Sequence, residues 1–221
     1  MSAPSLPLLS LLETRVVGVL VEKQHTVPDT YPLTLNALVA GCNQKTSRSP
    51  VIEAGEAQVQ EALDHLKSLS LVVESSGGRV MRYAHNAGRV LQLPPQSVAL
   101  LATLFNRGPQ TAGELRINAE RLHRFGDISA VEAFLSEMAE RAAGALVREL
   151  PRRAGERETR WAHLLSGEPE AAPAPTPKPA SATDAVSLGE IAALKAHVDR
   201  LESQVAELRE SIDQLRRDLG A

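Results

Sequence analysis

Apolar and polar positions follow helical spacing in three stretches of the first half of the chain. Apolar side chains recur every three or four residues over 11–24, after Pro32, and again over 56–70. Such spacing gathers them on one face of an amphipathic helix. Two short apolar runs then flank a Ser-Ser-Gly-Gly segment within residues 71–85, a pattern typical of a β-hairpin. The first half therefore predicts three helices followed by a hairpin.

The second half repeats this order. A helix is expected over 96–106, and the sequences Thr111-Ala-Gly-Glu114 and Ser129-Ala-Val-Glu132 each resemble a capping box that opens a further helix. A second hairpin is expected within 145–165. The two hairpins end alike, because Arg-Tyr-Ala-His at 82–85 matches Arg-Trp-Ala-His at 160–163, 78 residues further on. Helix–helix–helix–hairpin twice over predicts a tandem winged-helix protein. The alternative is two unrelated small α+β domains.

The last part of the chain has a different pattern. Prolines are frequent over 169–179, which favours an extended linker without a core. After residue 187, apolar side chains are spaced alternately three and four residues apart, with β-branched residues mostly at one heptad position and leucine at the other. This pattern favours a parallel two-stranded coiled coil, hence a homodimer. A coil with another protein and a helix folded back on the protein itself are the alternatives. The predicted dimerisation residues are Ile191, Leu194, Val198, Leu201, Val205, Leu208, Ile212, Leu215 and Leu219.

These patterns define the expected organisation of the chain. The fold class is α+β, mainly α, with tandem winged-helix domains followed by a Pro-rich linker and a C-terminal coiled-coil helix. The expected segments are a tail at 1–9, winged-helix domains at 10–90 and 91–167, a linker at 168–186 and the coiled-coil helix at 187–220.

Several runs of residues resemble a known bacterial family. They are Glu13–Val39, Cys42–Val51, Arg107–Leu115, Arg121–His123 and Trp161–Leu165. Together they resemble the YceH-like family over roughly residues 10–167, and Ser49 departs from the aspartate expected there. The resemblance implies a tandem winged-helix fold and supplies no catalytic residues. The linker and the coil lie outside it.

Net charge narrows the function classes. The chain has 24 Lys and Arg against 27 Asp and Glu, and the net charge of −3 resides entirely in residues 169–221. This balance excludes a polybasic nucleic-acid coat protein and a polybasic membrane binder. Glu13 and Arg15 interrupt the apolar N-terminal stretch, so a signal peptide or spanning helix is not expected. The lone Cys42 suits a reducing compartment, and a cytoplasmic protein without membrane contact is predicted.

Nucleic-acid binding is the central functional hypothesis. The third helix of each half is expected to expose mainly acidic side chains, which disfavours the usual recognition-helix contact with DNA. Basic and amide side chains gather instead on the turn after the second helix and on the two hairpins. The candidate contacts with duplex DNA are Asn43, Gln44, Lys45, Arg48, Arg79, Arg82, Arg152, Arg153 and Arg157.

The predicted function is therefore a dimeric transcriptional regulator, and the alternative is a protein–protein adaptor that uses the same domains without binding DNA. Glycine-rich phosphate loops and paired metal-ligand motifs do not occur in the sequence. An enzyme is accordingly not expected, nor is a cofactor or a metal.

Overall fold

The computed structural model describes residues 8–76, 80–152, 156 and 158–168. The described residues belong to one compact unit. Within its described part, the fold is α+β and mainly helical, with two small antiparallel sheets of two strands each. This confirms the coarse fold class expected from the sequence. The predicted linker beyond residue 168 and all the predicted coiled-coil positions lie outside the described residues.

The elements follow the same order in both halves, here called the first and second repeat. The first repeat contains α1 (Leu11–Thr26), the short 3-10 helix η1 (Pro28–Thr30), α2 (Leu35–Cys42), α3 (Glu56–Ser68), β1 (Val72–Ser75) and β2 (Arg82–His85). The connecting helix α4 (Ala87–Val90) was not expected from the sequence. The second repeat contains α5 (Pro95–Arg107), α6 (Ala112–Asn118), α7 (Ile128–Ala139), β3 (Val147–Leu150) and β4 (Arg160–His163).

The hairpins are built alike down to their register. Val72 faces His85 across the first sheet, and Val147 faces His163 across the second. In each repeat a residue just before the second helix forms an additional bridge to the aromatic residue of the returning strand. These bridges join Leu33 to Tyr83 and Gln110 to Trp161. The similarity between the repeats therefore extends from element order to strand pairing.

Side chains fix where the helices begin. The Ser10 hydroxyl accepts the amide of Glu13, and the Glu13 carboxylate accepts the amide of Ser10, which forms the capping box at the start of α1. Thr111 and Glu114 make the same reciprocal pair at α6, as the sequence predicted. The capping box predicted at Ser129 is wrong. Helix α7 begins two residues earlier, because the Asp127 carboxylate accepts the amide of Ala130.

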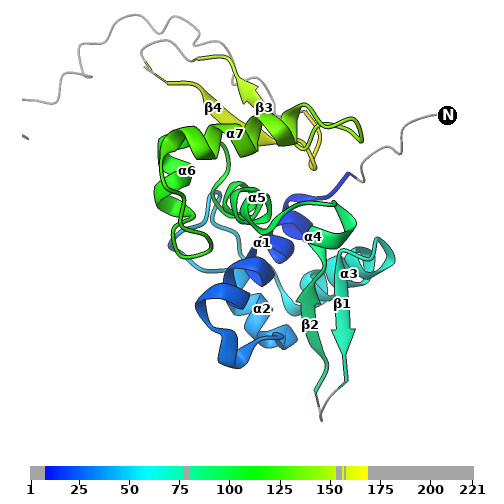
Figure 1. Cartoon of the computed structure of the whole chain (residues 1–221). Coiled ribbons are helices and arrows are strands. Elements are labelled where there is room, and N and C mark those ends of the chain that lie inside the picture. The colour runs from blue at the N-terminus through cyan, green and yellow to red at the C-terminus, as the bar shows by residue number, and fades with distance from the viewer. Residues whose placement is uncertain (1–7, 77–79, 153–155, 157, 169–221) are drawn as a thin grey trace, which may run out of the picture. The chain divides into compact units, whose positions relative to one another are not determined.

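The first helices of the two repeats pack against each other at the centre of the unit (Figure 1). Residues 13–21 of α1 and 97–106 of α5 are buried without interruption, so both helices are covered on every side. Gly18 permits the close approach, because a Cβ there would lie 2.7 Å from Asn106 Oδ1 and 3.1 Å from Phe105 Cβ. None of the helices in the described ranges is long and apolar enough to cross a membrane.

Candidate functional site

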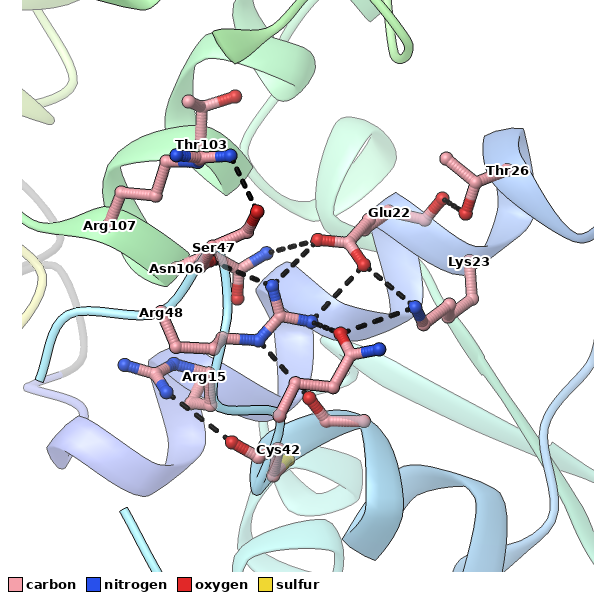
Figure 2. A network of polar contacts seen from close by, with 12 residues as sticks. Arg15, Glu22, Lys23, Thr26, Cys42, Ser47, Arg48, Thr103, Asn106 and Arg107 are labelled. Atoms are coloured by element: carbon pink, nitrogen blue, oxygen red, sulfur yellow. Dashed lines mark hydrogen bonds and ion pairs between the residues drawn. The ribbon is translucent and has the colours of Figure 1, made fainter. Parts of the chain in front are cut away.

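A network of polar side chains lies between the two repeats, where α1, the loop after α2 and the end of α5 meet (Figure 2). Its centre is an ion pair between Arg48, in that loop, and Glu22, near the end of α1. Arg48 Nη1 and Nη2 donate to the two Glu22 carboxylate oxygens at 2.8 and 3.1 Å. The same guanidinium also donates to the Gly41 carbonyl at 3.1 Å and to Gln44 Oε1 at 2.7 Å. Arg48 is 6% exposed, so this network is built into the interior.

The second repeat joins the network through the last turn of α5. Asn106 Nδ2 donates to a Glu22 carboxylate oxygen at 3.4 Å, and the Asn106 carbonyl accepts the amide of Ser49 at 2.8 Å. Arg107 Nη2 donates to the Ser47 hydroxyl at 2.7 Å. These contacts connect residues 57 or more positions apart in the chain, and they fix the loop of the first repeat against a helix of the second.

Positive charge exceeds negative charge in this region. The network contains four cations, of Arg15, Lys23, Arg48 and Arg107, and one carboxylate, of Glu22 (Figure 2). Lys23 and Arg48 form ion pairs with Glu22, at 2.9 and 2.8 Å. Arg15 is fully buried, and among the described residues its guanidinium donates only to the backbone carbonyls of Cys42 and Pro50. Within the described ranges, Glu22 is the only carboxylate that pairs with any of these four cations.

The ionisation of these groups reflects their burial and their neighbours. Burial lowers the pKa of the Arg15 guanidinium, and the nearby positive charge of Arg48 lowers it further. Burial lowers the pKa of Arg107, and the positive charge of Arg48 lowers it further, whereas the negative charge of Glu22 raises it. Burial favours a raised pKa for Glu22, but hydrogen bonds from Arg48 and Lys23 outweigh it and hold the pKa below 4.5. Glu22 is therefore ionised at neutral pH.

A cavity of about 250 Å³ opens beside this network and is here called the inter-repeat cleft. It is bounded by the end of α1, the turn after α2, the end of α5 and the connection between α6 and α7. Most of its lining groups are cations, amides or hydroxyls. The lining residues that bear on its chemistry are Glu22, Lys23, Gln44, Ser47, Arg107 and Arg121.

The four turn residues predicted to contact DNA have different surroundings. The Asn43 side chain exchanges hydrogen bonds of 2.8 and 2.9 Å with the backbone of Ala54, which closes the loop between α2 and α3. Gln44 and Arg48 belong to the buried network described above. Lys45 is exposed and makes no side-chain hydrogen bond or ion pair with the described residues. Lys45 is therefore the turn residue best placed to meet an external partner.

The hairpin arginines are mostly engaged with the protein. Arg82 Nη1 donates to the carbonyls of Thr30 and Pro32 at 3.1 and 2.8 Å. Arg160 pairs with Glu114 at 3.1 Å and with Glu156 at 3.3 Å. Arg152 is exposed. The other predicted hairpin contacts, Arg79, Arg153 and Arg157, lie outside the described residues.

Three arginines that sequence reasoning missed lie at and after the end of α6. Arg121 and Arg124 are exposed and Arg116 is half-buried; none makes a side-chain hydrogen bond or ion pair within the described part of the chain. Arg121 borders the inter-repeat cleft, and Arg116 and Arg124 border a second cavity. The sequence does indicate this basic group, because residues 116–124 contain three arginines and a single acidic residue, Glu120.

The third helices carry exposed acidic side chains, as expected. On α3 these include Glu61 and Asp64, and on α7 they include Glu132 and Glu137. No group of three or more His, Cys, Asp or Glu side chains in the described ranges is arranged to hold a metal ion.

The fold and the network define a mainly helical α+β protein made of two like-ordered repeats that share an interior polar site. The chain belongs to the UPF0502 family, whose model, described as "Protein of unknown function, DUF480", matches residues 9–156. A UPF0502 protein of Dechloromonas aromatica is 60% identical over 209 residues, covering 94% of this chain and 95% of the relative. A UPF0502 protein of Burkholderia ambifaria is 56% identical over 212 residues, covering 96% and 89%. A UPF0502 protein of Methylibium petroleiphilum is 59% identical over 201 residues, covering 91% and 85%.

Proposed function

We propose that the protein is a cytoplasmic tandem winged-helix transcriptional regulator that binds duplex DNA. Two features of the fold support the winged-helix assignment. Each repeat has three helices followed by a two-stranded hairpin, and in each the residue just before the second helix bridges to the returning strand. A helix-turn-helix core with a hairpin after it is the arrangement by which such domains approach DNA.

The observation that carries the proposal is a group of available cations at the ends of the second helices and on the connections that follow them. Lys45, Arg121 and Arg124 lie on the connections, and Arg116 lies in the last turn of α6. We call these four residues the basic turn surface. The turn that carries Lys45 and the segment that carries Arg121 border the same cleft, so the two connections lie close together. Side chains of this kind position a protein on DNA through contacts with phosphates.

The acidic third helices determine how DNA would be contacted. Carboxylates of Glu61 on α3 and Glu132 on α7 would repel phosphates if those helices entered the major groove. Contact through the basic turn surface avoids this repulsion. The proposed binding is therefore governed by phosphate contacts and is strongly dependent on salt.

Dimerisation through residues 187–220 forms part of the same proposal. A parallel coil would pair two copies of the DNA-binding unit and would double the phosphate contacts. Measuring the mass of the full chain and of a chain lacking residues 186–221 tests this. We expect a dimer and a monomer, respectively, at micromolar concentration, and a monomeric full chain contradicts the coil.

Fluorescence anisotropy with a generic duplex tests DNA binding. We expect binding at low salt that weakens as salt rises, with a log–log slope of about −0.9 for each phosphate contact. Arg124→Gln and Lys45→Gln should each reduce the magnitude of that slope by about 1 per DNA-binding unit. Arg89→Gln is the matched control, because Arg89 is also exposed but lies on α4. Equal effects of all three substitutions would indicate general charge attraction and would contradict the proposed surface.

A protein–protein adaptor is the second candidate. Exposed apolar side chains favour it, because Ile117 on α6 is 68% exposed and Ile128 at the start of α7 is 45% exposed. Apolar groups of this kind beside acidic helices suit a protein surface better than a phosphate backbone. Failure to bind duplex at low salt, where phosphate contacts are strongest, would favour the adaptor.

A further inference from the structure

We propose that the inter-repeat cleft binds a small metabolite that carries phosphate, at the junction of the two repeats. This site is separate from the proposed DNA contact, because its principal groups face a cavity and do not belong to the exposed basic turn surface. Arg121 alone belongs to both.

The charge balance of the site is the first argument. Of the four cations, Lys23 and Arg48 share the Glu22 carboxylate, and Arg15 and Arg107 have no carboxylate partner among the described residues. Arg15 and Arg48 are almost wholly buried. Buried charges in proteins are normally paired, because an unpaired ion loses its hydration without compensation. Within the described ranges Glu22 can neutralise only one of the four. An anion in the adjoining cleft would compensate for part of the remaining positive charge.

The groups that line the cleft are the second argument. Lys23 provides an ammonium group and Arg107 a planar guanidinium, the two side chains most used to hold phosphate oxygens. Arg121 adds a second guanidinium that makes no hydrogen bond or ion pair with the described residues, and the Ser47 hydroxyl and Gln44 amide add neutral hydrogen-bonding groups. Such a lining disfavours an apolar ligand, and the excess positive charge disfavours a metal cation.

The size of the cleft limits the ligand. Pockets for drug-sized molecules usually measure about 300–1,000 Å³, and the inter-repeat cleft measures about 250 Å³. A mono- or diphosphate group with a small substituent is therefore the expected class. Because the cleft is bounded by both repeats, an anion held there would contact the turn after α2 and the α6–α7 connection together.

Isothermal titration of the full-length protein with inorganic pyrophosphate tests the proposal, in chloride buffers of constant ionic strength. We expect saturable binding with one site per chain. Arg121→Gln and Lys23→Gln should each weaken the affinity at least about tenfold, as loss of a charge-assisted hydrogen bond predicts. Arg89→Gln removes the same charge outside the cleft and should leave the affinity unchanged. Arg121→Gln also guards against a folding artefact, because that side chain is exposed and makes no hydrogen bond or ion pair with the described residues.

Three results would overturn the proposal. One is a dissociation constant weaker than about 1 mM for pyrophosphate, since that affinity corresponds to only about 4 kcal/mol. Another is an equal loss of affinity in Arg89→Gln, which would indicate non-specific attraction. The third is that pyrophosphate does not bind, whereas a short duplex binds at the site and loses affinity in Lys23→Gln. The phosphate would then come from a nucleic-acid backbone. Pyrophosphate binding requires no DNA, so this test and the anisotropy experiment can fail separately.

Discussion

Replacing Glu22 with glutamine should destabilise the protein strongly, because it removes the negative partner of a buried arginine. The Arg48 side chain has no exposed surface, and its two terminal nitrogens donate to the Glu22 carboxylate at 2.8 and 3.1 Å. Removing one partner of such a pair costs about 3–5 kcal/mol, since the other charge is left buried without compensation. Glutamine keeps one acceptor oxygen, so a loss of about 3 kcal/mol is expected.

Urea denaturation of the full chain measures this loss. With a slope of about 2 kcal/mol per M, a loss of about 3 kcal/mol lowers the midpoint by about 1.5 M. The matched control is Glu74→Gln, because Glu74 pairs with Lys67 at 2.8 Å but both side chains are partly exposed. Pairs of that kind contribute about 0–1 kcal/mol. The double variant Glu22→Gln with Arg48→Met should lose less than the two single variants added together, by at least about 1 kcal/mol.

The pH dependence provides a second measurement of the same interaction. The pKa of Glu22 lies below 4.5 in the folded protein, so its contribution to stability is present above that pH and is lost as the pH falls through the folded-state pKa. The difference between the wild type and Glu22→Gln should accordingly shrink in acid. The reasoning is refuted if Glu22→Gln costs no more than Glu74→Gln, or if the two substitutions of the cycle are additive.

Three further predictions concern the interior. Gly18→Ala should lower the unfolding free energy by about 1–2 kcal/mol, because the new Cβ would lie 2.7 Å from Asn106 Oδ1 and overpacking outweighs the helix propensity of alanine. Urea denaturation measures this loss, and Gly126→Ala is the control, because a Cβ at Gly126 would meet no neighbouring atom within 4 Å. Equal stabilities of the two variants would contradict the close packing. Cys42 should resist a thiol reagent at pH 8 until urea unfolds the protein, since it is fully buried and burial raises its pKa to about 11; rapid labelling of the native chain would disprove this. Burial lowers the pKa of His163 to about 4, so its neutral form stabilises the fold above pH 6.5 and that stability is lost as the pH falls toward 4. His163→Gln should therefore flatten the plot of unfolding free energy against pH between 6.5 and 4. An unchanged slope of that plot would refute the assignment.

Local signals in the sequence predicted most of the elements but not all of their boundaries. The spacing of Val16, Val19 and Leu20 correctly predicted α1, because one helical face is visible as a period near 3.6. The burial of Val17 and Val21 on its other sides was not predicted, since it depends on α5, about 80 residues away. Helix α4 was missed for a different reason: its four residues are too few to display a period.

The candidate site was harder to predict than the fold. Arg48 was expected to contact DNA, because a basic residue on a polar turn is usually exposed. In the folded protein its carboxylate partner is Glu22, 26 positions earlier, and the network is completed by Asn106, 84 positions after Glu22. Nothing in the local sequence indicates such pairings. Lys45, in contrast, was placed on the turn after the second helix, and it is exposed there; its contact with DNA stays a prediction.

The position of the polar network follows from the way the repeats pack. Close approach of α1 and α5 at Gly18 brings Asn106 next to Gly18, and Asn106 in turn donates to the ionised Glu22. Small domains are stable by only about 5–15 kcal/mol, so uncompensated charge at such a junction is a substantial cost. A ligand at 100 times its dissociation constant adds about 2.7 kcal/mol to folded-state stability. This nearly equals the loss expected from removing the Glu22 charge. At that concentration, an anion in the inter-repeat cleft would therefore stabilise the folded state nearly as much as the carboxylate that the chain itself provides.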